Sequence, residues 1–528
     1  MSEASPGASP PWRPSHNPWA VAMTVTLATF MEVLDTSIAN VALPHIAGAL
    51  SAGQDESTWV LTSYLVSNAI VLPISAWCSD RFGRKRFYMT CVLLFTLSSL
   101  LCGLSTTLPM LIFFRVLQGA GGGGLGPSEQ AILADTFLPK QRGMGFAMYG
   151  MAVVLAPAIG PTLGGYITDN FSWHWIFFIN VPVGVLSLIL TSRMVEDPPW
   201  IRDAREQAKH SPVDYMGLGL IAVGLGALQV VLDKGQREDW MASHFIQIFT
   251  VICVVGLLAF IVWEWREQHP ILNLRLLRNR NLAVSSVLMF ILGWVLYGST
   301  VLIPQLLETV LGYTAELAGM VLSPGGFVVM ALMPMVGLLV TRIDPRKLIA
   351  FGFVSLAASM FHMASINAGI DFKTIMMYRT YQMAGLAFLF VPINTLCYIG
   401  VPQEQNNQVS SMVNLMRNLG GSFGISFVTT MLARRMQVHQ AELASHTVNS
   451  NLMQRLLQSM SSTYAVRLGS GPGAMQRAYG NVYGMMQQQA AVLSYRDTIL
   501  IMAILTLAVM PLLLLARKPK PGEAHLGH

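Results

Sequence analysis

The chain has 528 residues, of which 53% are hydrophobic and only 11% are charged. A soluble domain carries roughly 25% charged residues, so this composition excludes an ordinary soluble protein. The formal net charge of +6 does not indicate nucleic-acid binding, because the cations are concentrated in short segments between apolar runs. The five cysteines lie in or beside those runs, without metal or redox spacing.

Apolar runs of about 20 residues recur along the chain, and each can cross a hydrocarbon core about 30 Å thick. We therefore predict an all-α integral membrane protein. The runs predict fourteen spans, at 19–41, 58–78, 88–106, 108–134, 143–167, 175–193, 214–232, 245–263, 282–305, 317–340, 348–366, 375–398, 409–432 and 497–516.

Lys and Arg are concentrated in alternate connections between these runs, which places both termini in the cytoplasm. Residues 1–16 are rich in Pro and Ser and are expected to form a disordered cytoplasmic tail, and 517–528 a second tail. The first apolar run is too long for a signal-peptide core and lacks a cleavage site, so we expect a retained helix.

The first span contains two acids, Glu32 and Asp35, three residues apart and therefore on one helix face. At 1.5 Å per residue, Asp35 lies about 10 Å from the outer end of its helix, and Arg115 lies at a similar depth in span 108–134. A buried charge is costly, and the matching depths make an ion pair between them geometrically possible. Its two interpretations are a proton switch and a static pair that orders two helices.

Other polar residues within spans are candidates for a substrate cavity. Glu129 follows the Gly-rich run 119–126, which lacks the GK[ST] ending of a nucleotide-binding loop, and is expected at an inner vestibule or on the surface. Arg379 is about 6 Å from its outer helix end and could be interfacial, whereas Arg417 has no evident acid partner. The candidate cavity residues are Glu32, Asn40, Gln118, Glu129 and Arg417.

The connection SDRFGRKR at 79–86 combines an acid, a glycine and a basic cluster. Membrane anchoring explains the basic residues but does not require the acid or the glycine. A charge latch between neighbouring helices, closed when the inner gate is shut, explains all of them. Its members are Asp80, Arg81, Gly83, Arg84 and Lys85.

Span 143–167 contains APAIGPTLGG. Gly160 and Gly164 form a small-xxx-small pair that permits close helix approach, and Pro161 removes a backbone hydrogen bond. Together with Gly165 they indicate a packing motif.

The chain repeats itself. RVLQGAG at 115–121 matches RTYQMAG at 379–385, and Pro73, Ala76 and Arg81 match Pro334, Gly337 and Arg342 at a similar offset. Duplicated halves are typical of secondary transporters whose substrate site lies between the halves. We predict a six-helix half at 17–195, two inserted helices within 196–281 that fill or brace the interface, and a second half at 282–516.

Residues 434–496 are too long for a simple connection and are expected outside the membrane. Apolar residues recur at helical spacing around 452–467, before a breaker, SGPG, at 470–473. The segment is either a tolerated insertion or a docking surface for an extracytoplasmic partner.

The motifs together resemble the major facilitator superfamily, specifically the fourteen-span drug:proton antiporters of the EmrB/QacA type. LDTSIANVALP at 34–44, SDRFGRKR, RVLQG at 115–119 and GPTLGG at 160–165 resemble its first-span, loop, proton-relay and antiporter motifs. WHWIFFINVPVG at 173–184 and LDKGQREDW at 232–240 resemble the EmrB branch. Ala76 and Ala156 replace glycines of the family pattern.

The resemblance implies the major facilitator fold and proton-driven export of hydrophobic compounds across a bacterial inner membrane. It assigns proton coupling to Asp35 and Arg115, with the proton gradient in place of a cofactor. It also implies a periplasmic membrane-fusion adaptor and an outer-membrane channel as partners, which suits residues 434–496. A proton-coupled importer and a non-transporting scaffold or sensor remain alternatives, whereas no catalytic constellation supports an enzyme. The substrate is not readable.

Overall fold

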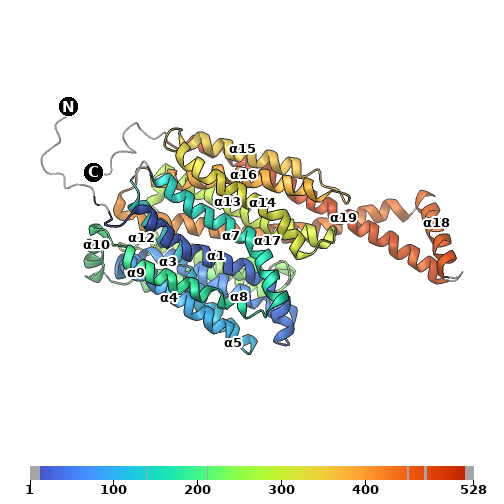
Figure 1. Cartoon of the computed structure of the whole chain (residues 1–528), viewed down its shortest axis with the longest axis horizontal. Helices are drawn as coiled ribbons and strands as arrows, with labels where there is room; N and C mark the ends of the chain where they lie inside the picture. The colour runs from blue at the N-terminus through green and yellow to red at the C-terminus, as the bar shows by residue number, and fades with distance from the viewer. Residues whose placement is uncertain are drawn as a thin grey trace.

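The computed structural model describes residue 12 and residues 14–138, 141–210, 212–448, 451–468 and 472–517. These residues form an elongated bundle of helices, in which the first half of the chain lies along one side and the last half along the other (Figure 1). The prediction of an all-α protein is confirmed.

In the first half, α1 packs against α7 and α9, and α5 lies between α3 and α4. Its helices are α1 (Pro18–Ala49), α2 (Gln54–Ser57), α3 (Trp59–Phe82), α4 (Arg84–Gly103), α5 (Leu108–Gly122), α6 (Leu125–Thr136), α7 (Arg142–Asn170), α8 (Trp175–Phe178) and α9 (Asn180–Met194).

The middle segment holds α10 (Pro199–His210), α11 (Tyr215–Lys234) and α12 (His244–Arg266). In the last half, α13 packs against α17 and α16, and α14 contacts α7 of the first half. Its helices are α13 (Arg280–Gln305), α14 (Ala315–Leu339), α15 (Pro345–Met363), α16 (Phe372–Cys397), α17 (Asn406–Val448), α18 (Asn451–Leu468) and α19 (Pro472–Ala508).

Twelve helical segments within the described residues are long and apolar enough to cross a membrane. The predicted spans 348–366 and 409–432 coincide with α15 and α17, which do not reach that level, so the count of fourteen is not established. In α17 the reason is visible, because it buries the polar residues Asn407, Ser410, Asn414 and Arg417 against neighbouring helices.

The predicted span 108–134 is divided into α5 and α6 at Gly123 and Gly124. The Gly-rich run allows close approach to α3 and α4: a Cβ on Gly123 would lie 2.6 Å from the carbonyl oxygen of Asn68, and one on Gly124 would lie 2.8 Å from a ring carbon of Phe87. Only glycine fits such contacts, so the run is a packing feature.

The described residues of 434–496 are helical. They extend α17 to Val448 and start α19 at Pro472, with α18 packed on α19. These helices project beyond the bundle at one end (Figure 1). The segment is rich in Gln, Met and Ala, which favour helix, and proline is well suited to the first helical turn.

The predicted tails at 1–16 and 517–528 fall mostly outside the described residues. Trp12 nevertheless packs edge-on against Trp200 of α10 at 5.8 Å, and the Ser15 backbone N–H donates to Glu196 Oε2 at 3.3 Å. Trp12 and Ser15 therefore lie beside the end of α9 and the start of α10, in contacts that the composition of residues 1–16 did not predict.

Candidate functional site

Asp35 of α1 and Arg115 of α5 form a buried ion pair. Arg115 Nη1 donates to Asp35 Oδ2 at 2.7 Å, and the two side chains are 0% and 1% exposed. The structure thus brings together the two charges that depth counting placed at one level. Because both side chains are buried, solvent does not screen the attraction between the two charges.

Two amides complete the surroundings of the carboxylate. Gln118 Nε2 and Asn180 Nδ2 both donate to Asp35 Oδ1, at 3.0 and 2.7 Å, while Arg115 Nε donates to the carbonyl oxygen of Val60 at 3.1 Å. Three donors thus hold the ionised carboxylate, two on Oδ1 and one on Oδ2. Protonation of Asp35 would remove the charge that Arg115 neutralises.

Asn180 was not among the predicted site residues. It begins α9 after the break between α8 and α9, and its Nδ2 also donates to Ser99 Oγ at 3.0 Å. Asn180 lies within the WHWIFFINVPVG motif, and this motif was the feature of the sequence from which it could have been identified as a site residue.

Glu32 lies one helical turn from Asp35 in a second polar cluster. It accepts hydrogen bonds from the Tyr64 hydroxyl at 2.9 Å and from Asn68 Nδ2 at 3.3 Å. Asn68 Oδ1 in turn accepts from Asn418 of α17 at 2.9 Å. The Tyr64 ring lies 4.4 Å from the Arg115 guanidinium carbon, so one tyrosine touches both clusters.

Arg417 has a tyrosine rather than an acid as its partner. Its Nη1 donates to the Tyr149 hydroxyl at 2.6 Å, and this hydroxyl donates to Asn414 Oδ1 at 2.8 Å. Asn414 Nδ2 donates to Gln130 Oε1 at 2.6 Å, and Gln130 also hydrogen-bonds to Asn394. This polar network joins α6 and α7 to α16 and α17 across the middle of the protein.

The other candidate cavity residues are separated. Glu129 in α6 is fully buried and accepts from Thr26 Oγ1 at 2.7 Å, so it is not a surface acid. Gln118 belongs to the Asp35 cluster, and Asn40 is exposed on α1. Arg379 is only 1% exposed, and because α16 begins at Phe372 it lies further from the end of its helix than the predicted span implied.

The latch was predicted as a contact between neighbouring helices, but its contacts also include α6 and α17. Arg84 donates through Nη1 to Asp135 Oδ2 at 2.5 Å and through Nε to Asn407 Oδ1 at 2.7 Å. Asn407 Nδ2 donates to Asp80 Oδ1 at 2.5 Å, and Asn406 Nδ2 to Asp135 Oδ1 at 2.6 Å. The start of α17 is therefore tied to α3, α4 and α6, and this end of the protein is closed.

The remaining latch residues act nearby. Gly83 has a φ of +91°, which favours glycine. The Lys85 backbone N–H donates to Asp197 Oδ1 at 2.9 Å and its Nζ to the Ser192 carbonyl oxygen at 2.7 Å, which ties the loop to the end of α9. Arg81 lies 5.6 Å above the Trp77 ring instead.

The glycines of α7 differ in what they contact. A Cβ on Gly160 would lie 2.5 Å from Ser37 Cβ, and one on Gly164 would lie 3.3 Å from the Ile38 backbone, so both permit close packing with α1. Gly165 has no neighbour within 4 Å of that position. Pro161 lies inside α7, which continues to Asn170.

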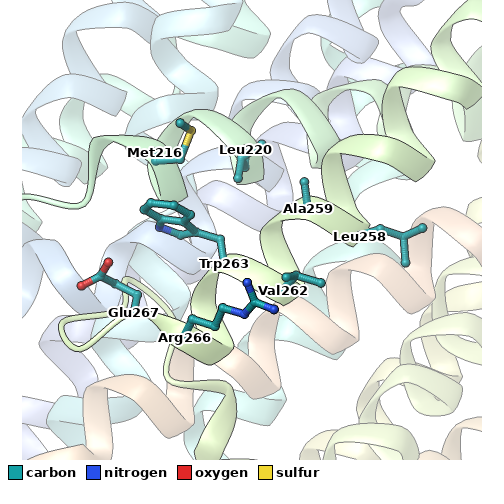
Figure 2. Close-up of a pocket in the computed structure, with 8 residues that line it drawn as sticks. All are labelled: Met216, Leu220, Leu258, Ala259, Val262, Trp263, Arg266 and Glu267. Carbon is teal, nitrogen blue, oxygen red and sulfur yellow. The ribbon is translucent and has the colours of Figure 1, made fainter.

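A surface groove lies between α11 and α12 (Figure 2). It contains apolar side chains such as Met216, Leu220 and Trp263, with Arg266 and Glu267 at one end. Since it is formed by α11, α12 and the next residue, none of the candidate site residues lines it.

Residues 25–425 match the family model described as Major Facilitator Superfamily. The chain belongs to this superfamily. It is 36% identical over 510 residues to the multidrug export protein EmrB of Escherichia coli K12, covering 96% of this chain and 97% of that protein. It is 35% identical over 513 residues to the fatty acid resistance protein FarB of Neisseria gonorrhoeae, covering 97% and 98%. The colistin resistance protein EmrB of Acinetobacter baumannii is 30% identical over 94% of this chain and 95% of its own length.

Solved structures of the superfamily share the fold. The proton:xylose symporter XylE, bound to a bromodeoxyglucose, aligns with a TM-score of 0.59 at 14% identity, over 93% of this chain and 95% of that one. The human organic anion transporter MFSD10 aligns with a TM-score of 0.55 at 12% identity, over 93% and 100%. The protein is therefore a multi-pass membrane transporter of the major facilitator fold and not an enzyme.

Proposed function

We propose that this transporter is a drug:proton antiporter that exports hydrophobic toxic compounds across a bacterial inner membrane. The observation that carries the proposal is the dry Asp35–Arg115 pair, held by Gln118 and Asn180 in a chain whose relatives are named for multidrug export. A carboxylate in this position can exchange one proton per cycle without exposing a charge to lipid.

Arg115 sets the proton affinity of Asp35. Arginine stays protonated, so it acts as a fixed charge that favours the ionised carboxylate while the pair is intact. Protonation from the outer side weakens the pair and releases Arg115 and Gln118. Loss of the proton to the cytoplasm restores the contacts that the structure contains and resets the pump.

The closed latch defines the conformation within this cycle. The contacts of Arg84 and Asn407 hold the end that we assign to the cytoplasm, so cargo release toward the outside is compatible with the structure. Opening to the cytoplasm requires Asn407 to leave both Arg84 and Asp80.

We place cargo recognition between the Glu32 and Arg417 clusters, which lie where the two halves meet. One contributes an acid and the other a cation, each held by a tyrosine hydroxyl. Such a pair accommodates amphiphilic compounds of either charge. The relatives named for colistin and for fatty acids are consistent with this breadth.

The proposal includes two six-helix halves, at 17–195 and 282–516, with α11 and α12 inserted within 196–281 and both termini cytoplasmic. If α15 and α17 also cross the bilayer, the spans number fourteen. The projecting ends of α17 and α19, together with α18, are then periplasmic. We assign them to contact with a membrane-fusion adaptor, through which cargo passes to an outer-membrane channel.

Everted membrane vesicles test the exchange. Respiration acidifies their lumen, and a transported compound should then release protons, measured as recovery of a quenched pH-sensitive dye. A panel of cationic, neutral and acidic hydrophobic compounds should include at least one that drives this release. Energy-dependent accumulation of the same compound in whole cells would contradict export and favour an importer.

A further inference from the structure

The buried cluster around Arg379 repeats the geometry of the Asp35 cluster with one change. Arg115 and Gln118 correspond to Arg379 and Gln382, which are also three residues apart. In both halves the arginine Nη1 donates to the glutamine Oε1, at 2.8 Å in the first and 2.6 Å in the second.

The position equivalent to Asp35 is Ser299. Arg115 bonds to the residue 80 positions before it, Asp35, and Arg379 bonds to the residue 80 positions before it, Ser299, with Nη1 to Oγ at 2.9 Å. The second half has therefore kept the cation and the amide but has a serine in place of the carboxylate.

Two donors in the second cluster have no acceptor, and one of them, Gln382 Nε2, corresponds to a donor that Asp35 accepts from in the first half; Arg115 also has one nitrogen, Nη2, without a partner. Arg379 and Gln382 are 1% and 0% exposed, and both Arg379 Nε and Gln382 Nε2 lack a hydrogen-bond partner. In the first half, the corresponding amide group, Gln118 Nε2, donates to the carboxylate of Asp35. Within the described part of the chain, no acidic side chain lies in ion-pair contact with Arg379.

A buried guanidinium without a counter-charge is costly, and arginine does not avoid the cost by losing its proton. All the orphaned groups are donors, so the missing component is an acceptor that carries negative charge. A cation does not fit these groups, and a water molecule would leave the charge uncompensated.

We propose that Arg379 and Gln382 bind a small anion, of the size of chloride or a carboxylate group, beside Ser299, whose own hydroxyl donates to the Leu296 carbonyl oxygen at 3.0 Å; the anion takes the place that Asp35 fills in the first half. The anion neutralises Arg379. It makes the second half depend on a diffusible ligand where the first half uses its own side chain. This inference does not rest on the proposed cargo or on proton coupling.

The test uses the purified full chain in detergent, with chloride titrated against a bulky organic sulfonate, which carries no carboxylate, at constant ionic strength. Ligand that binds only the folded state raises its stability with concentration. We expect the melting temperature of the wild type to rise by a few degrees as chloride replaces the sulfonate, and that of Ser299→Ala to rise as well, because the donors of Arg379 and Gln382 remain.

Two variants should lose this response. Ser299→Asp supplies an internal carboxylate and should melt at the same, higher temperature with or without chloride. Arg379→Gln removes the charge and should not respond, which preserves the test if Ser299→Asp does not fold.

Acetate in place of chloride separates the sources: stabilisation by acetate alone assigns the site to a carboxylate, and stabilisation by chloride assigns it to a halide. No anion effect on the wild type, or equal shifts in wild type and Arg379→Gln, would overturn the proposal.

Discussion

The substitution Asp35→Asn examines the buried pair directly, since it keeps the shape of the side chain and removes its charge. An asparagine has one acceptor oxygen. If that oxygen faces Gln118 and Asn180, its NH₂ group faces Arg115 and leaves the guanidinium unpaired, which costs about 3–5 kcal/mol. If the oxygen faces Arg115, the NH₂ group opposes two other donors, at about 1–3 kcal/mol for each unsatisfied group.

Either arrangement weakens the link that Arg115 and Gln118 of α5 make to α1, and neither can bind a proton. We expect cargo-induced proton release from everted vesicles to fall to the background of empty vesicles, and resistance of the host to the cargo to be lost. Asp35→Glu, which retains an acid, should keep part of the activity.

The matched control is Asp371→Asn, the same chemical change at the exposed N-cap of α16, where Asp371 Oδ2 accepts from the Thr374 backbone N–H at 3.3 Å. Asparagine caps helices as well as aspartate does, so activity should be unchanged. If Asp35→Asn reached the membrane at the wild-type level and retained more than about half of the proton release, the interaction would be structural and not part of the transport step.

Three further perturbations follow from individual contacts. Gly160→Ala forces a Cβ into Ser37 and should lower the stability measured by thermal unfolding by about 1–3 kcal/mol. The control, Gly165→Ala, places its Cβ in open space and should be neutral or slightly stabilising. Equal effects of the two substitutions would refute the close packing at Gly160. Asn407→Ala removes the two bonds that Asn407 itself makes, to Asp80 of α3 and to Arg84 of α4. Spin labels on those helix ends should then show a larger population of long distances, and an unchanged distribution would exclude a latch. Tyr149→Phe removes the hydroxyl that bonds to both Arg417 and Asn414, and it should raise the KM for cargo by about tenfold. The control, Tyr398→Phe, removes a buried hydroxyl that has no hydrogen-bond partner and should leave the KM unchanged.

Depth along a helix was predictable from the sequence, whereas rotation about its axis was not. Asp35 and Arg115 were paired correctly because counting residues from two helix ends is a one-dimensional problem. The same counting failed for Arg379, because α16 starts at Phe372, three residues before the predicted span, and the surrounding helices cover the side chain.

The neutral amides were missed for a different reason. Asn180, Asn407 and Asn414 all hold charged or polar partners in the structure, yet an amide in an apolar run gives a weak signal because its burial costs far less than that of a charge. Their partners lie on distant helices, and only packing determines which helix face meets which.

The unbroken α17 has a mechanical consequence. It has 43 residues and is therefore about 65 Å long, from Asn406 beside the latch to Val448 on the projection. A rod of that length turns a small tilt at one end into a large displacement at the other, and a rotation of about 10° about the latch would move the far tip by about 11 Å. A protein bound at the tip would therefore act on the opposite end of the molecule, and it would influence the opening of the latch without touching it.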